Sequence, residues 1–128
     1  QEDGGRICAP IGREAGSGLR RCVRPDGSPS QTEFRVLFRF KETRRTLLSL
    51  RLQTGRTHQI RVHLAHIGHP VTGDALYGAP CPLLPDRFAL HAWRAALTQP
   101  FTGARIDVRA PLPEGFAALA HQCGEGTL

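Results

Sequence analysis

Alternating apolar and polar residues in the middle of the chain predict a β-hairpin. From Phe34 to Phe40 every second residue is a phenylalanine or a valine, which is the period of a strand with one buried face. A polar turn, Glu42–Arg45, separates this run from Leu48–Leu52, in which every second residue is leucine. The two runs therefore predict two paired strands joined by a short turn.

A helical period replaces the alternation a few residues later. Three apolar residues recur at i, i+4 and i+7 and are expected to face the core: Ile60, Leu64 and Ile67. We expect Thr57 to be the N-cap residue, because its hydroxyl can accept a hydrogen bond from the first turn. Gly68, followed by a proline two residues later, supplies a stop signal at the other end.

The rest of the chain shows weaker patterns. Residues 1–33 are rich in Gly, Pro, Ser and Arg, and they predict an extended arm with at most a short strand. Glycines and prolines interrupt His69–Pro85, which is typical of a loop. Phe88–Leu97 and Ile106–Ala110 predict a second hairpin, and Pro113 is expected to open a short second helix.

Length and composition predict one α+β domain. With 128 residues, 40% of them hydrophobic, the chain is long enough to bury a core. We expect a curved antiparallel or mixed sheet with two helices over residues 34–128, after the arm. The chain shows neither a signal peptide nor a membrane span, so a cytoplasmic location with no membrane partner is predicted. Four scattered cysteines without a CxxC pair are expected to be free thiols.

The charge balance predicts a polyanionic partner. Lysine and arginine number 17 against 11 Asp and Glu, which gives a net charge of +6 and a pI of about 10.1. Lys41 is the only lysine. Arginine is the residue suited to bidentate phosphate contacts and to stacking on bases. RNA or DNA is therefore the first candidate partner.

The richest candidate chemistry lies in the loop and helix TGRTHQIRVHLAHIG, Thr54–Gly68. His58 and Arg61 share a stripe beside the apolar face, which places Arg61 at the border of the core. A guanidinium there stays charged and needs a carboxylate or phosphate nearby. Alternatively, the methylene groups of Arg61 cover the core and its guanidinium group pairs with an acidic residue at the surface. Arg56 adds a second cation at the positive end of the helix dipole, which favours phosphate binding.

A histidine series in the same region raises the question of a metal site. His63, His66 and His69 recur every third residue. Three helical residues advance about 300°, so the first two are neighbours, but His69 follows the glycine that ends the helix. No cysteine or acid completes a known metal-binding spacing, although Asp74 could approach. We therefore predict no metal and expect the histidines to pack, hydrogen-bond or contact RNA.

The run L-x-TGRTHQIRVHLA-x-IGHP-V-x-GD-x-LYG, Leu52–Gly78 here, closely resembles the signature of the RluA-type pseudouridine synthases. Three further segments share the resemblance: APIGRE at Ala9–Glu14, TEFRVL at Thr32–Leu37 and FALHAWRAALTQPFTGARIDVRAPLPEGF at Phe88–Phe116. The resemblance implies an enzyme that isomerises uridine to pseudouridine in structured ribosomal or transfer RNA, on a curved mixed sheet. It also implies that the reaction uses no cofactor and no metal.

The resemblance gives roles to residues of the loop and helix. Arg61 matches the basic residue that pairs with the catalytic aspartate in this family, so it is the expected catalytic residue. A guanidinium beside that carboxylate would keep it ionised at neutral pH. The target base must leave its stack to be reached, and the neighbouring residues are expected to grip the RNA. The expected RNA-binding residues are Arg56, Thr57, His58 and Gln59.

The family's catalytic aspartate and active-site tyrosine have no counterpart in the sequence. The aspartate lies in an HRLD-like element and the tyrosine in a later segment, both N-terminal to the matched region. Asp3 and Asp26 lie in unlike sequence, and Asp74 and Tyr77 belong to the GD-x-LYG turn. We therefore interpret residues 1–128 as the C-terminal portion of the catalytic domain, inactive without a missing N-terminal half. The alternatives are a non-catalytic RNA-binding module derived from the same fold and a histidine metal site.

Overall fold

The computed structural model describes residues 3–85, 87–92, 94–111 and 113. The described part contains one helix and seven strands: β1 (Gly4–Cys8), β2 (Ile11–Arg13), β3 (Arg21–Val23), β4 (Gln31–Phe40), β5 (Arg45–Leu52), α1 (Gln59–His66), β6 (Arg94–Thr98) and β7 (Arg105–Arg109). The described strands pair antiparallel, which confirms the predicted α+β class. The second helix, expected to open at Pro113, falls on residues outside the described ones.

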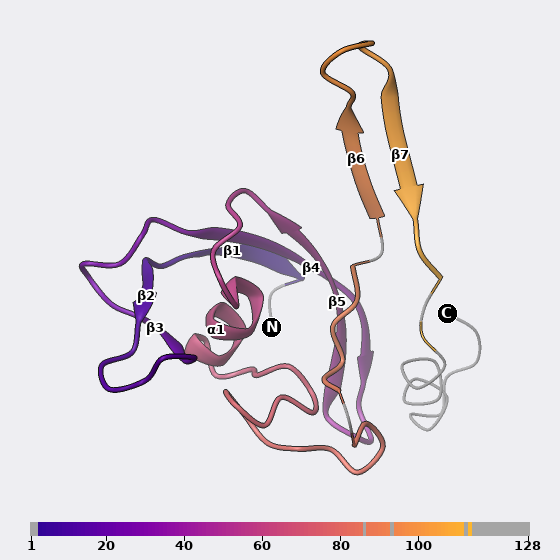
Figure 1. The fold of residues 1–128 in the computed structure, drawn as a ribbon. Helices are drawn as coiled ribbons and strands as arrows, with labels where there is room; N and C mark the ends of the chain where they lie inside the picture. Colours follow the sequence, from indigo (N-terminus) through magenta and orange to yellow (C-terminus); the bar gives the residue numbers. More distant parts are fainter. Residues whose placement is uncertain (1–2, 86, 93, 112, 114–128) are drawn as a thin grey trace.

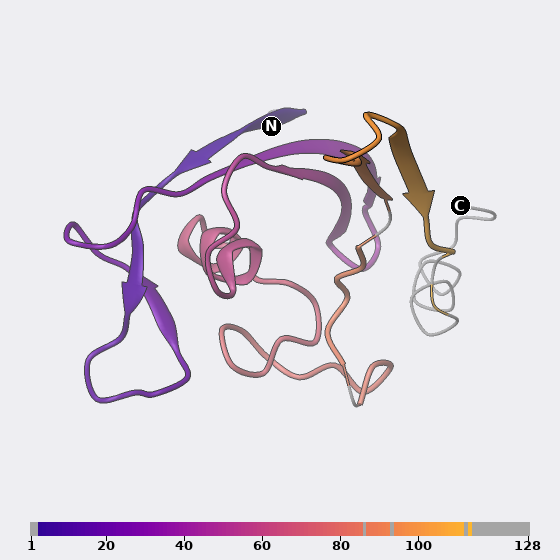
Figure 2. The same cartoon turned by 45° about the horizontal axis from the view of Figure 1, so that its top comes forward.

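The main sheet has the strand order β1-β4-β5, and β4 and β5 are the hairpin predicted from the alternation. Phe34 of β4 lies opposite Leu50 of β5 on one side and opposite Gly5 of β1 on the other. Figure 2 shows this sheet arching over α1, so that the helix occupies its concave face. The sheet thereby buries the apolar side of its strands against the helix.

A β-bulge at Leu37 interrupts the alternation of β4. The register with β5 shifts between Val36 and Phe38, which leaves Leu37 as an extra residue. Leu37 and Phe38 are exposed, whereas Phe40 is buried. The single buried face expected along the whole strand is therefore wrong at Phe38, because a bulge changes the register that strict alternation assumes.

Residues 4–23 contain three strands, so the expected extended arm with at most a short strand is wrong. β1 adds to the edge of the main sheet, with Ile7 opposite Thr32 of β4. β2 and β3 form a separate hairpin in which Arg13 lies opposite Arg21. These strands have only three to five residues and few apolar side chains. Pairing with distant residues forms them, and a local period does not reveal such strands.

The core lies between the main sheet and α1. Its buried members are Ile7 of β1, Leu64 of α1 and Val71 of the loop after the helix. Partly buried apolar residues pack around them: Phe34, Leu48, Leu50, Ile60, Phe88, Ala89 and Leu90. Residues 88–92, predicted to begin a strand, form none, and the first three of them cover the core instead.

The ends of α1 differ in part from the prediction. The N-cap residue is His58, in the left-handed region with a φ of 56°, and no side chain caps the helix, so Thr57 is not the N-cap. At the other end Gly68 has a φ of +84° and turns the chain, as predicted. The helix has already ended at His66, which leaves Ile67 exposed. The predicted core packing of Ile67 is therefore wrong.

His63 is a polar residue at the centre of the helix–sheet interface. Its side chain is fully buried, with Nδ1 2.8 Å from the Thr32 hydroxyl oxygen and Nε2 2.9 Å from the Ala9 carbonyl oxygen. Because a carbonyl oxygen can only accept, Nε2 carries the proton and Nδ1 accepts from Thr32 when the ring is neutral. The imidazole thus connects α1 to β4 and to the segment after β1.

His63 should make the free energy of unfolding fall on acidification. Burial lowers its pKa below 6.5, against the opposing effect of the Ala9 carbonyl. The unfolded chain then binds more protons, so the stabilisation is complete above pH 6.5 and is lost as pH falls through the lower, folded pKa. Urea denaturation between about pH 8 and pH 5 measures this slope. His63→Gln should flatten it, with His69→Gln, an exposed residue of the loop after the same helix, as control. An unchanged slope in His63→Gln would show that another group causes it.

The second hairpin is shorter than predicted. β6 pairs with β7, and the turn between them contains Gly103, whose φ is +71°. Arg94 and Asp107 form an ion pair across the two strands. In Figure 1 this hairpin projects away from α1 and the arched sheet. It therefore contributes little to the surroundings of the helix.

The described part of the chain has no helix long and apolar enough to cross a membrane. Its cysteines, Cys8, Cys22 and Cys81, are free thiols, as their spacing predicted. Cys123 lies outside the described residues.

Candidate functional site

Arg61, in the first turn of α1, forms a bidentate ion pair with Asp74 from the loop after the helix. Nε and Nη2 of Arg61 each donate to one carboxylate oxygen at 2.8 Å. The Asp74 side chain is fully buried, and that of Arg61 is 14% exposed. The predicted need of Arg61 for an anionic partner is confirmed. Because the partner is buried, the alternative pairing with a surface acid does not apply.

The loop backbone holds the Asp74 carboxylate in place. The N–H groups of Leu76 and Tyr77 donate to Oδ1 at 3.2 and 3.3 Å, which is the hydrogen bonding of an Asx turn. Gly73 precedes it with a φ of +82°, and a Cβ there would lie 3.0 Å from the carbonyl oxygen of Arg87. Glycine is therefore the residue that fits before this aspartate.

Opposing effects act on the Asp74 carboxyl group. Burial raises its pKa, whereas hydrogen bonds from Arg61, Tyr77 and Leu76 and the positive charge of Arg61 lower it. The pKa of Asp74 lies below its ordinary value of 3.8, and the hydrogen bond to Asp74 raises the pKa of Arg61. Both groups are therefore charged at neutral pH. Asp74 serves as the counter-ion of Arg61, which leaves it poorly suited to act as a nucleophile.

Two aromatic rings also contact the Arg61 guanidinium. Its Cζ lies 4.2 Å from the ring centroid of Phe88 and 5.0 Å from that of Tyr77. Together with the two hydrogen bonds to Asp74, these contacts fix the orientation of the group. Nη1 has no acceptor among the described residues, so it is a donor that Arg61 can offer to a second anion.

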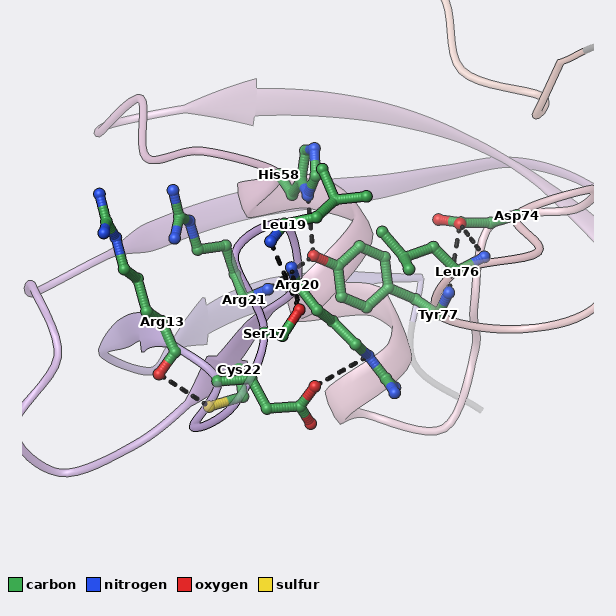
Figure 3. Close-up of polar contacts among 11 residues, drawn as sticks. Arg13, Ser17, Leu19, Arg20, Arg21, Cys22, His58, Asp74, Leu76 and Tyr77 are labelled. Atoms are coloured by element: carbon green, nitrogen blue, oxygen red, sulfur yellow. Dashed lines mark hydrogen bonds and ion pairs between the residues drawn. The ribbon is translucent and has the colours of Figure 1, made fainter.

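The Tyr77 hydroxyl connects the loop, the helix and the β2–β3 hairpin (Figure 3). It accepts a hydrogen bond from the backbone N–H of Arg21 at 2.9 Å and lies 2.8 Å from Nδ1 of His58. Burial lowers the pKa of His58, and the charges of Arg61 and Arg21 lower it further. In the neutral imidazole, Nδ1 of His58 can accept a hydrogen bond from the Tyr77 hydroxyl.

Gln59 is a structural residue of the segment before α1. It is 3% exposed. Its amide nitrogen donates to the Gln31 carbonyl oxygen and the Thr32 hydroxyl, and its Oε1 accepts from the Arg56 N–H and the Thr54 hydroxyl. Both polar atoms of the side chain are therefore used within the protein. The structure corrects the prediction that Gln59 contacts RNA, because a buried, fully bonded amide has nothing to offer a ligand.

The other predicted RNA-binding residues lie nearer the surface. Arg56 and Thr57 are exposed, and His58 is half-buried. Nε and Nη2 of Arg56 donate to the carbonyl oxygen of Pro29 at 3.1 and 3.0 Å. The structure thus brings His58 close to Arg61 through Tyr77, whereas Arg56 and Thr57 line a separate groove beside the β2–β3 hairpin.

Sequence reasoning missed Asp74 and Tyr77 as members of the site. The GD-x-LYG pattern predicts only a turn for these two residues, because a turn explains glycine and aspartate on its own. One signal could have found Asp74: an arginine at the core border needs a carboxylate, and this aspartate follows it within the same motif.

The histidine series does not converge on one point. Both ring nitrogens of His63 are bonded to Thr32 and Ala9, while His66 and His69 are exposed. Among the residues that the structure describes, no three His, Cys, Asp or Glu side chains are placed to hold a metal.

The arched sheet and its helix define the fold as that of an RNA pseudouridylate synthase domain. Human RNA Pseudouridylate Synthase Domain Containing 1 matches with a TM-score of 0.74 and 32% identity, over 88% of this chain and 50% of that one. Human RNA Pseudouridylate Synthase Domain Containing 4, 21% identical with a TM-score of 0.65, shares the fold. The sequence model of the RNA pseudouridylate synthase family matches residues 1–66, and the chain belongs to this family.

Curated relatives agree with this assignment and are much longer. Ribosomal large subunit pseudouridine synthase D of Nitrosomonas europaea is 47% identical over 92% of this chain. An uncharacterized RNA pseudouridine synthase of Bacillus subtilis is 48% identical over 90%. The chain spans 36% and 38% of the length of these two relatives. The match therefore covers only part of each relative.

Proposed function

We propose that this chain is part of an RNA pseudouridine synthase, which isomerises uridine to pseudouridine in structured RNA. The observation that carries the proposal is the Arg61 guanidinium, fixed by Asp74 and two rings with one nitrogen left to donate. Membership of the family supports an isomerase. The relative from Nitrosomonas europaea is a ribosomal large subunit synthase, which favours ribosomal RNA over transfer RNA. A ribosomal substrate in turn favours a cytoplasmic location.

In the proposed reaction an aspartate from an N-terminal half of the domain attacks the target nucleotide. Nη1 of Arg61 donates to that carboxylate and keeps it ionised. The bond from C1′ of the ribose to N1 breaks, the uracil turns, and a bond from C1′ to C5 replaces it. The hydrogen on C5 leaves as a proton and N1 gains one, so the atoms of the product equal those of the substrate. No cofactor or metal is part of this proposal.

The loop before α1 is proposed to contact the RNA near the target nucleotide. Arg56 and Thr57 present exposed side chains there, and His58 lies between them and the Arg61 pair. The net charge of +6 favours attraction of the RNA backbone. The target base is expected to flip out of its stack to reach the site.

A tritium-release assay tests the proposed reaction. The complete protein is expected to release tritium from ribosomal RNA labelled at C5 of uridine, because C5 loses its hydrogen when it bonds to C1′. The 128-residue chain alone should release none, and addition of the N-terminal half as a separate polypeptide should restore release. RNA binding by the complete protein without any release would instead favour a non-catalytic RNA-binding module.

A further inference from the structure

A second basic site, apart from the Arg61 pair, lies between the β2–β3 hairpin and the loop before α1. A groove of about 340 Å³ is lined there by three arginines from three segments: Arg13 of β2, Arg21 of β3 and Arg56 of the loop. Ser28 and Thr57 add hydroxyl groups to the lining. Among the residues that the structure describes, no carboxylate and no aromatic ring lines this groove. It is therefore suited to an anion rather than to a base.

The pairing of β2 with β3 brings two of these cations together. Arg13 lies directly opposite Arg21, so the two side chains share one face of the hairpin. Figure 3 shows them side by side, with both guanidinium groups pointing in the same direction. Like charges directly opposite each other destabilise a strand pair. An anion that bridges the two groups would remove this repulsion.

One of the arginines that line the groove carries a donor without a partner among the described residues. Nη1 of Arg21 is buried, and no described residue accepts a hydrogen bond from it. A buried N–H without an acceptor costs free energy, which a ligand oxygen would recover. Arg56 faces the groove from the loop, with its Nε and Nη2 fixed by the Pro29 carbonyl oxygen. Arg56 is thus held in place before any ligand arrives.

Close packing fixes the wall of the groove. Ile11 and Ser28 form an isolated antiparallel bridge, which joins β2 to the chain that leads into β4. A Cβ on Gly27 would lie 2.6 Å from the carbonyl carbon of Ile11, so glycine is needed at this contact. Arg24 donates from Nη1 to the carbonyl oxygen of Arg13 at 2.7 Å. The hairpin is therefore a rigid support for the two arginines.

We propose that this groove binds consecutive backbone phosphates of the RNA substrate through Arg13, Arg21 and Arg56. The proposal rests on the proposed function, because it takes RNA as the ligand. Arginine forks match phosphate oxygens. Phosphate contacts fix the register of a nucleic acid without reading its sequence. The groove would thus hold the strand while the target base reaches Arg61.

Binding of fluorescent oligouridylate to the complete protein tests the groove. The double variant Arg13→Gln with Arg21→Gln should raise Kd about tenfold or more and lower the slope of log Kd against log salt by about 0.7 for each lost contact. Arg51→Gln with Arg105→Gln is the matched control, since it removes the same charge from exposed residues of β5 and β7. The control should change Kd about twofold or less. Arg56→Gln, which leaves the hairpin intact, should weaken binding in the same way as the groove pair.

Equal weakening by the groove pair and the control pair would overturn the groove proposal. The proposal would also be overturned if inorganic phosphate displaced the oligouridylate completely when both supply the same concentration of phosphate groups. The ligand of the groove would then be free phosphate. Tritium release by the unaltered protein separates this proposal from the proposed function. Release without any effect of the groove variants on RNA affinity disproves the groove alone. Loss of affinity in those variants, without release by the unaltered protein, disproves the function alone.

Discussion

Replacement of Arg61 by alanine in the complete protein should lower the rate of uridine isomerisation about a hundredfold to a thousandfold. This is the usual cost of removing one fixed donor from a site where charge develops. In the proposed reaction Nη1 of Arg61 is the donor that keeps the attacking carboxylate ionised. Tritium release at saturating RNA, measured in a single turnover, reports this step without a contribution from product release. A folded Arg61→Ala protein with near-normal release would contradict the role of Arg61.

Arg61→Lys is the matched variant for this measurement. It keeps the positive charge but cannot form two parallel hydrogen bonds to Asp74 or lie flat against Phe88. We expect its rate to lie between those of the alanine variant and the unaltered protein. A lysine rate equal to that of arginine would show that charge alone is needed, and that the orientation set by Asp74 does not matter.

The structure adds a folding control to the Arg61 experiment. From the sequence alone, Arg61→Ala is expected to leave the fold largely intact. The structure shows that this variant should lose stability, because it leaves the buried charge of Asp74 without its partner. The double variant Arg61→Met with Asp74→Asn removes both charges and should recover part of the lost stability. If its isomerisation rate stays low, the loss is chemical and not a consequence of unfolding.

Local periods were sufficient to predict the β4–β5 hairpin, the helix and the loop between them. Each of these depends on the spacing of side chains that are close in the sequence, as in the alternation from Phe34 to Phe40. The long gapped motif predicted the protein family, and the comparisons confirm that prediction. The position of Arg61 at the core border also followed from helix geometry, and its buried ion pair agrees with that.

Features that depend on distant contacts were not predictable in this way. β1 has no period of its own and forms because it pairs with β4. In the sequence Gln59 is a polar residue of a basic loop. In the structure its amide nitrogen donates hydrogen bonds to Gln31 and Thr32, which lie 28 and 27 residues earlier. His58 occupies a left-handed conformation, which only a few per cent of non-glycine residues adopt. Sequence periodicity carries no information on such partners.

Asp74 should have the largest effect of any described carboxylate on the free energy of unfolding. Asp74→Ala leaves the Arg61 charge, which is only 14% exposed, without its partner. It also removes the acceptor of the Leu76 and Tyr77 N–H groups. Breaking a buried pair in this way costs about 3–5 kcal/mol. Asp74→Asn keeps an acceptor for those N–H groups and should cost less, about 1–3 kcal/mol. Urea denaturation measures both values.

The pH dependence distinguishes a lost charge from a packing defect at the same position. Because the folded pKa of Asp74 lies below 3.8, its stabilisation is complete above pH 3.8 and is lost as pH falls through the folded pKa. Asp74→Asn should therefore destabilise the protein at neutral pH and lose this acid dependence. Asp26→Asn is the matched control, because Asp26 pairs with Arg24 at the exposed surface, where ion pairs contribute little. Equal effects of the two substitutions would show that the burial of Asp74 is not what makes the Arg61 pair important.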